Sequence, residues 1–163
     1  MENKLFLDIE TTGLDVKKDR ILCVGVKLNE QEVQVFTDKE AFKEWVVYKV
    51  FNSSPKRVGD SITWGGHNVS FDAKFLNTLW GVGLPDSYID TKLIAHSRNP
   101  HESHRLKDLA KTYLKEEGVI RLQDLQGKGK KKLKLEEVDT ELLKEYCKQD
   151  VELCYRLWKL WTV

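Results

Sequence analysis

Hydrophobic residues in the first quarter of the chain follow the two-residue period of β-strands. Buried runs are expected at residues 4–9 and 21–28, and an alternating run at 32–37. Asn29 and Glu30, between the last two runs, suit a tight hairpin. Three successive strands of this kind predict an antiparallel meander at the start of a sheet.

Further along, strand-like segments alternate with segments that have the 3.6-residue period of helices. The expected elements are a helix from the N-cap Asp38 with apolar positions 42, 45, 46 and 50, a strand at 61–66, a helix at 70–80 capped by Ser70, a strand at 87–91, a helix from Lys92, a helix at 103–114 capped by Ser103, and a long helix at 139–161. This order predicts an α/β protein with a mixed five-stranded sheet flanked by helices.

Composition limits the class of protein. A chain of 163 residues with 40% hydrophobic and 33% charged residues suits one globular domain, here 1–163, and is neither disordered nor fibrous. No apolar run approaches the ~20 residues that span a bilayer, and the N-terminus lacks a signal-peptide pattern, so we expect a cytoplasmic protein without a membrane contact. The three cysteines form no CxxC pair, which suits a reducing compartment.

The net charge of +1 argues against a general polyanion binder, but the charge is unevenly distributed. Residues 127–134, GKGKKKLK, contain five lysines and no acid. Such a segment can attract a phosphate backbone, with salt-sensitive binding, or can be a solvated surface loop that aids solubility.

Four acids combine into a candidate metal site. Asp8 and Glu10 lie two residues apart on a strand and therefore on one face, and Asp72 is in the first turn of a helix after a strand. Asp150 lies one turn after Tyr146 on the apolar face of the last helix. Buried carboxylates are costly and repel one another unless they bind a cation, and Mg²⁺ prefers oxygen ligands.

Each acid taken alone also has an ordinary explanation. Asp72 can stabilise a helix N-terminus, Asp150 can pair with a lysine of its own helix, and Glu10 can be an exposed acid at a strand end. The joint pattern favours a metal site.

Three segments carry a resemblance to a known family. LDIETTGL (7–14), GGHNVSFDAKFL (65–76) and YCKQD (146–150) resemble, in order, the three motifs of the DEDD 3′–5′ exonucleases. The spacing from Tyr146 to Asp150 is that of the tyrosine subtype. The chain most resembles the proofreading exonuclease domain of family-A DNA polymerases, including at residues 104–114 and 124–138, and the likeness runs from about residue 4 to 160.

This resemblance implies an RNase H-like (DnaQ-like) fold and two divalent cations, Mg²⁺ or Mn²⁺. It implies hydrolysis of the terminal phosphodiester at a 3′ end, which releases nucleoside 5′-monophosphates. By the same resemblance, Asp8 bridges both ions, Glu10 and Asp150 hold the ion that carries the attacking water, and Asp72 holds the second ion. Tyr146 orients the water through its hydroxyl.

Substrate contacts are expected beside these residues. Leu14 either separates the last base from its neighbour or is an ordinary turn residue, and Phe71 either meets the penultimate nucleotide or belongs to the core. The expected substrate-binding residues are Thr11, Leu14, Asn68, Phe71, Lys128, Lys130 and Lys131.

The leading hypothesis for the substrate is a single-stranded or frayed DNA 3′ end. The same chemistry on RNA, as in the RNase D group, is the alternative, and a non-catalytic nucleic-acid-binding module is a third. The last predicted helix ends close to Val163, which predicts a free-standing proofreading or trimming enzyme with a separate DNA polymerase subunit as a candidate partner.

Overall fold

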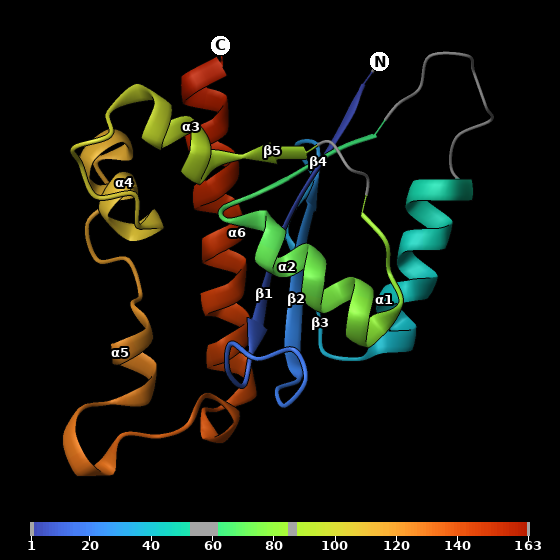
Figure 1. The fold of residues 1–163 in the computed structure, drawn as a ribbon, viewed down its shortest axis with the longest axis horizontal. Coiled ribbons are helices and arrows are strands. Elements are labelled where there is room, and N and C mark those ends of the chain that lie inside the picture. Colours follow the sequence, from blue (N-terminus) through green and yellow to red (C-terminus); the bar gives the residue numbers. More distant parts are fainter. Residues whose placement is uncertain (1, 53–61, 85–87, 163) are drawn as a thin grey trace.

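The computed structural model describes residues 2–52, 62–84 and 88–162. They form a mixed five-stranded sheet with helices on both faces, as the sequence predicts (Figure 1). The strand order is β3-β2-β1-β4-β5, which places β1 at the centre. The expected loop at 51–60 lies mostly outside the described residues.

The sheet combines an antiparallel meander with two parallel strands. β2 pairs antiparallel with β1 and with β3, whereas β4 pairs parallel with β1 and with β5. The strands are β1 (Asn3–Thr11), β2 (Ile21–Leu28), β3 (Gln34–Phe36), β4 (Ile62–Gly66) and β5 (Tyr88–Asp90). β3 is shorter than the run predicted at 32–37.

The predicted helices occur in the predicted order, and two of them continue as π-helical turns, whereas the short helix at 122–126 was not predicted. The helices are α1 (Lys39–Val46) with η1 (Val47–Asn52), α2 (Val69–Phe75) with η2 (Leu76–Trp80), α3 (Thr91–Arg98), α4 (Leu106–Leu114), α5 (Leu122–Gln126) and α6 (Thr140–Thr162), with short 3₁₀ turns at η3 (Gly129–Lys131) and η4 (Leu135–Glu137). α6 is the long helix predicted at 139–161 and runs along the sheet in Figure 1.

Alternation along β1 divides the core between the two faces of the sheet. Leu5, Leu7 and Ile9 pack in one cluster with side chains of α1 and α2. Phe6, on the opposite face, packs in a second cluster with side chains of α4 and α6. Because strand side chains alternate, Asp8 and Glu10 share the face of Phe6 and point toward α6.

Gly25 lets α6 approach the sheet beside Asp8, its partner in the β1–β2 register. A Cβ atom added at Gly25 would lie 2.9 Å from Val151 Cγ2 and 3.0 Å from Cys147 Sγ, both on α6. The absence of a side chain at this position therefore fixes how close the helix comes to the strand that carries the acids.

One of the three predicted N-caps is confirmed and two are wrong. The Asp38 side chain accepts a hydrogen bond from the Ala41 amide at 2.8 Å. Ser70 lies inside α2, which starts at Val69 after a left-handed Asn68. The amides of Asn68 and Val69 instead donate to the Asp90 carboxylate.

Ser103 also fails to cap its helix, because α4 begins three residues later at Leu106. Its hydroxyl donates to Asp108 at 2.6 Å. The three cysteines are free thiols buried in the protein. Within the described ranges, no helix has the length and apolar character needed to cross a membrane.

Candidate active site

The site is built around the carboxyl end of the central strand. Asp8 and Glu10 project from β1 toward α6, and both side chains are half-buried. The β1–β2 register shifts between Glu10 and Thr11, directly after the second acid. The chain then turns through residues 12–20 before it returns as β2.

Asp72 reaches the same strand from the first turn of α2. Its Oδ1 accepts a 2.8 Å hydrogen bond from the amide of Ile9, which lies between the two acids of β1. The Asp72 side chain is buried. Because β4 runs parallel to β1, the helix that follows β4 begins at the end of the sheet where these acids lie.

α6 supplies Asp150 and Tyr146, which are both buried. Lys107, from the first turn of α4, donates to the Tyr146 hydroxyl at 3.0 Å and to Asp150 Oδ2. The other carboxylate oxygen of Asp150 accepts from Gln149 Nε2 at 3.4 Å. The structure thus brings together all five residues that the sequence predicts as catalytic, and adds a lysine.

Removal from water raises the pKa of every carboxyl group in the cluster. Burial, followed by the charge of Asp150, raises the pKa of Asp8 to about 7. Burial and then the charge of Asp8 hold the pKa of Glu10 and of Asp72 well above their usual range. Burial also raises the pKa of Asp150, against the opposing effect of Lys107. Such a cluster is electrostatically unfavourable by itself and is relieved by cations.

The donor set fits hard divalent cations. Carboxylate oxygens of Asp8 and Glu10 and the Cys147 sulfur all lie within 4.8 Å of one another. Asp72 and Asp150 add oxygens from the two flanking helices. Several carboxylates on a strand and two helices, with Glu10 at a pocket that leaves room for water, match the preference of Mg²⁺ and Mn²⁺ for oxygen ligands.

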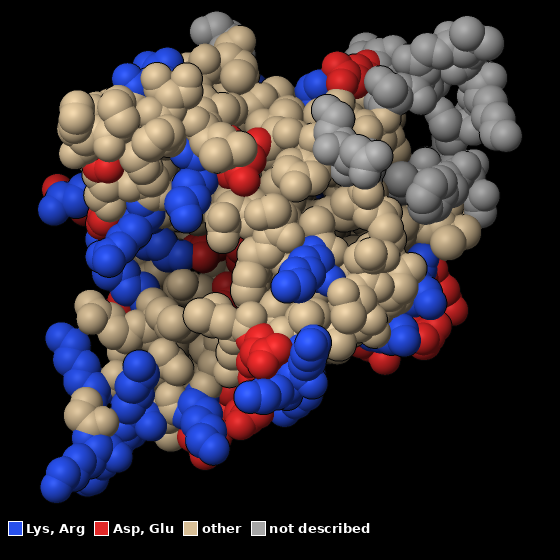
Figure 2. Space-filling model, in the orientation of Figure 1, with Lys and Arg blue, Asp and Glu red and all other residues tan. Residues whose placement is uncertain are grey.

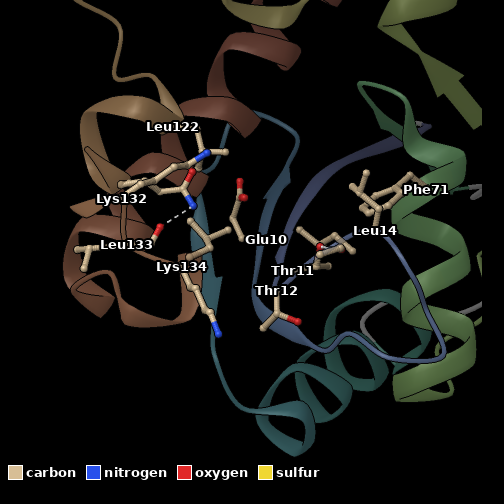
Figure 3. A pocket seen from close by; sticks show the side chains of 13 residues that line it. Glu10, Thr11, Thr12, Leu14, Phe71, Leu122, Lys132, Leu133 and Lys134 are labelled. Carbon is tan, nitrogen blue, oxygen red and sulfur yellow. Dashed lines mark hydrogen bonds between the residues drawn. The ribbon is translucent and has the colours of Figure 1, made fainter. Parts of the chain in front are cut away.

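A pocket of about 520 Å³ opens beside Glu10. Figure 3 shows Leu14 and Phe71 on one side, and Leu122, Lys132 and Lys134 on the other, with Glu10 and Thr11 between them. Leu14 is 85% exposed, the largest exposed fraction among the large hydrophobic residues of the described ranges, so its side chain is available to a ligand. The Thr11 hydroxyl donates to the Gly13 carbonyl at 2.6 Å.

A second pocket of about 600 Å³ lies on the other side of the acids, at the junction of α2, α3 and α4. It is lined by Asn68 and by three cationic side chains, Lys92, Arg105 and Lys107. His67 also lines it, and donates from Nε2 to the His104 carbonyl at 2.8 Å. Figure 2 shows acidic side chains deep in a hollow whose flank is basic.

The lysine segment, residues 127–134, borders the first pocket, but its lysines differ in position. Lys128, Lys130 and Lys131 are exposed and line neither pocket, whereas Lys132 and Lys134 line the first. Residues 127–134 and α5 together form the basic projection at the lower left of Figures 1 and 2. The sequence-based prediction of substrate-binding residues named Lys128, Lys130 and Lys131 and omitted the two lysines that line the pocket.

Lys107 was not predicted at all. The available signal was its position as the second residue of a helix, where a cation opposes the helix dipole and needs an acidic partner. That partner, Asp150, is 43 residues away in the sequence.

Comparisons with known proteins agree with the fold. The 3′–5′ exonuclease family matches residues 2–162. A relative in Methanocaldococcus jannaschii, Uncharacterized protein MJ0365, is 32% identical over 73 residues, which are 45% of this chain and only 39% of that relative. Among solved structures, Brucella melitensis NrnC bound to pGG has a TM-score of 0.67 and 24% identity, with 97% of this chain and 71% of NrnC covered.

Two further structures have the same fold. NrnC with bound Mg²⁺ has a TM-score of 0.66 and 22% identity over 97% of this chain and 71% of that chain. The family B DNA polymerase from Pyrobaculum calidifontis has a TM-score of 0.59 and 16% identity, over 96% of this chain and 24% of the polymerase.

The fold and the family match over residues 2–162 together define the class of protein, a nuclease with an RNase H-like sheet. The chain belongs to the 3′–5′ exonuclease family, of the DEDD type. Enzymes of this family act with two divalent cations, and the acidic cluster fits that requirement.

Proposed function

We propose that this protein removes nucleotides one at a time from the 3′ end of single-stranded or frayed DNA and releases nucleoside 5′-monophosphates. The observation that carries the proposal is the group of four acids around the end of β1, of which Glu10 lines the first pocket, with basic side chains lining both pockets. The match of the 3′–5′ exonuclease family to residues 2–162 supports it, and supports the prediction that 1–163 is one domain.

In this proposal Asp8, Glu10, Asp72 and Asp150 hold two Mg²⁺ or Mn²⁺ ions. When bound, these ions supply a water of lowered pKa as the nucleophile and stabilise the negative charge that develops on the leaving oxygen. The protein contributes a fixed arrangement of ligands, because the Ile9 amide holds Asp72 and α6 packs closely on Gly25.

Tyr146 positions the attacking water by hydrogen bonding. Its hydroxyl accepts from Lys107, which leaves its own hydrogen free to donate. Burial and the neighbouring acids raise the pKa of Tyr146 above its usual range, so the phenol stays protonated at neutral pH. A protonated phenol can orient a water molecule but cannot act as the general base.

The first pocket is proposed to receive the terminal nucleotide. Leu14 and Leu122 offer apolar surface on opposite sides for a base, and Lys132 and Lys134 offer charge for phosphates. The lone pairs of the Thr11 hydroxyl can accept from the terminal sugar. Phe71 lines this same pocket and Asn68 lines the second one, so a nucleotide strand that spans both pockets would meet the two residues predicted to contact the penultimate nucleotide.

RNA, including very short strands, is the second candidate substrate. The observation that favours it is that NrnC, which has the same fold, is bound to the dinucleotide pGG. A DNA polymerase subunit as a partner stays a prediction.

A gel assay tests the proposal. A 5′-labelled single-stranded DNA and its RNA twin are incubated with Mg²⁺, Mn²⁺ or EDTA, with Asp8→Ala as the inactive control. We expect a metal-dependent ladder that shortens from the 3′ end and is absent in the variant. Faster digestion of the RNA would identify RNA, rather than DNA, as the substrate. The absence of a ladder with both oligonucleotides would refute exonuclease activity of this chain.

A further inference from the structure

The ammonium group of Lys107 lies inside the candidate active site. Its Nζ donates to the Tyr146 hydroxyl at 3.0 Å and forms an ion pair with Asp150 Oδ2. The same atom lies 4.4 Å from the centre of the Tyr146 ring, within range of a cation–π contact. The Lys107 side chain is only 13% exposed.

Two features make this position costly for a lysine. Lys107 is the second residue of α4, where the positive end of the helix dipole repels a cation. A buried ammonium also loses its hydration. Asp150 and Tyr146 offset these costs, because they provide a carboxylate and an aromatic face for the charge.

The same carboxylate oxygen is required by a metal ion. We propose that Lys107 and a divalent cation compete for Asp150, so that Lys107 sets the metal affinity of the site. The inference rests on the proposed function, in which Asp150 is a metal ligand. Two positive charges that share one carboxylate repel each other, so Lys107 weakens cation binding at Asp150.

Lys107 has space to move when a cation takes its place. Its side chain lines the second pocket, of about 600 Å³, together with Lys92 and Arg105. Rotation toward this cavity separates the ammonium from Asp150 without a change in the backbone of α4. The competition therefore requires only a side-chain movement, whereas Asp150 stays fixed on α6.

A general effect of positive charge near the site would also weaken metal binding. Lys92 tests this explanation because it lines the same pocket but is exposed and has no ion pair with Asp150 in the structure. If contact with Asp150 matters, removing Lys107 changes metal affinity far more than removing Lys92 does.

The experiment is a calorimetric titration with Mn²⁺ alone, without nucleic acid. The proteins are the parent, Lys107→Met, Lys107→Gln, Lys107→Arg, Lys92→Met and Asp150→Asn, and thermal melting checks that each is folded. We expect Lys107→Met and Lys107→Gln to bind Mn²⁺ at least about tenfold more tightly than the parent. Lys107→Arg, which keeps the charge, and Lys92→Met should stay within about twofold of it.

Three results would overturn the inference in different ways. Unchanged Mn²⁺ affinity in the two neutral Lys107 variants would show that Lys107 does not compete with the cation, and it would leave the proposed function intact. An equal gain in Mn²⁺ affinity in Lys92→Met would show that the effect comes from positive charge near the site in general. A parent that binds no Mn²⁺, or an Asp150→Asn variant that binds like the parent, would reject the metal role of Asp150 and the inference with it.

Discussion

The amide of Ile9 donates a 2.8 Å hydrogen bond to the carboxylate of Asp72, a residue 63 positions further along the chain. Ile9 lies between Asp8 and Glu10, so the bond fixes the third acid against the strand that carries the first two. Because the donor is a backbone group, this contact does not depend on the side chain of residue 9. One hydrogen bond thus links the first two sequence motifs in space.

Charge and hydrogen bonding at Asp72 can be separated by two substitutions. Asp72→Asn keeps an oxygen for the Ile9 amide and loses the charge, so we expect a stable fold and a metal-dependent cleavage rate lower by about 100-fold. Asp72→Leu also leaves the buried amide without a partner, which should cost about 1–3 kcal/mol of unfolding free energy. Chemical denaturation and the cleavage assay measure the two effects, and cleavage by Asp72→Asn at the parent rate would contradict the metal role of this acid.

Gly25→Ala tests whether the close approach of α6 matters for activity. The new methyl group would lie 2.9 Å from Val151 Cγ2, so the helix has to shift away from β1. We expect a loss of about 1–3 kcal/mol in stability and a lower kcat, since Tyr146 and Asp150 move with the helix. Gly83→Ala is the control, because a methyl group there has no neighbour within 4 Å. Equal kcat for Gly25→Ala and the parent would show that the site tolerates this shift.

Leu14→Ala separates substrate binding from folding. Leu14 is 85% exposed, so its removal should change the unfolding free energy by less than about 0.5 kcal/mol. If Leu14 contacts a base, KM rises by roughly fivefold to tenfold, from the loss of about 1 kcal/mol of apolar contact. Leu160→Ala, at an exposed position near the end of α6, should leave KM unchanged. A KM for Leu14→Ala equal to that of the control would return Leu14 to the role of an ordinary turn residue.

The lysine segment should make binding sensitive to salt. Neutralising Lys128, Lys130 and Lys131 together should lower the slope of log K against log salt by about 2 if all three meet phosphates of a single strand. Fluorescence anisotropy with a labelled oligonucleotide in EDTA measures this slope. A control for the removal of surface charge neutralises two lysines, Lys39 and Lys43 on α1, on the opposite side of the view in Figure 1.

The outcome also distinguishes the two groups of lysines. If Lys132→Ala with Lys134→Ala changes the slope and the first three lysines do not, then only the lysines at the pocket touch the substrate. No change in either variant would mean that the segment serves solubility.

His67 predicts a pH dependence of stability. Burial lowers the pKa of His67 from its ordinary 6.5 to about 4. Between these values the unfolded chain binds a proton that the folded protein does not, so stability is complete above pH 6.5 and falls as the pH drops toward 4. A pKa difference of this size corresponds to about 3 kcal/mol.

The measurement is the difference in unfolding free energy between the parent and His67→Gln across pH 4 to 8. The glutamine amide can still donate to the His104 carbonyl but does not titrate. We expect the difference to depend on pH only below about 6.5. A difference that is constant with pH would mean that His67 titrates alike in both states.

The sequence by itself determined the local elements and the acids. β2 occupies the predicted residues 21–28, and α6 lies within one residue of its predicted bounds, because alternation and helical periodicity report which face of an element is buried. The acids in the three motifs, at 7–14, 65–76 and 146–150, could be predicted because each motif is a short continuous segment.

Only the tertiary structure decided which distant groups meet. Asp90, rather than Ser70, binds the first amides of α2, Lys107 pairs with Asp150, and Lys132 and Lys134 lie at the pocket rather than Lys128. Hydrophobic periodicity describes neighbours within one helix or strand and does not indicate which side chains approach from 20 or more residues away. These contacts depend on how α2, α4 and α6 pack around the end of β1, which is set by the packing of the whole core.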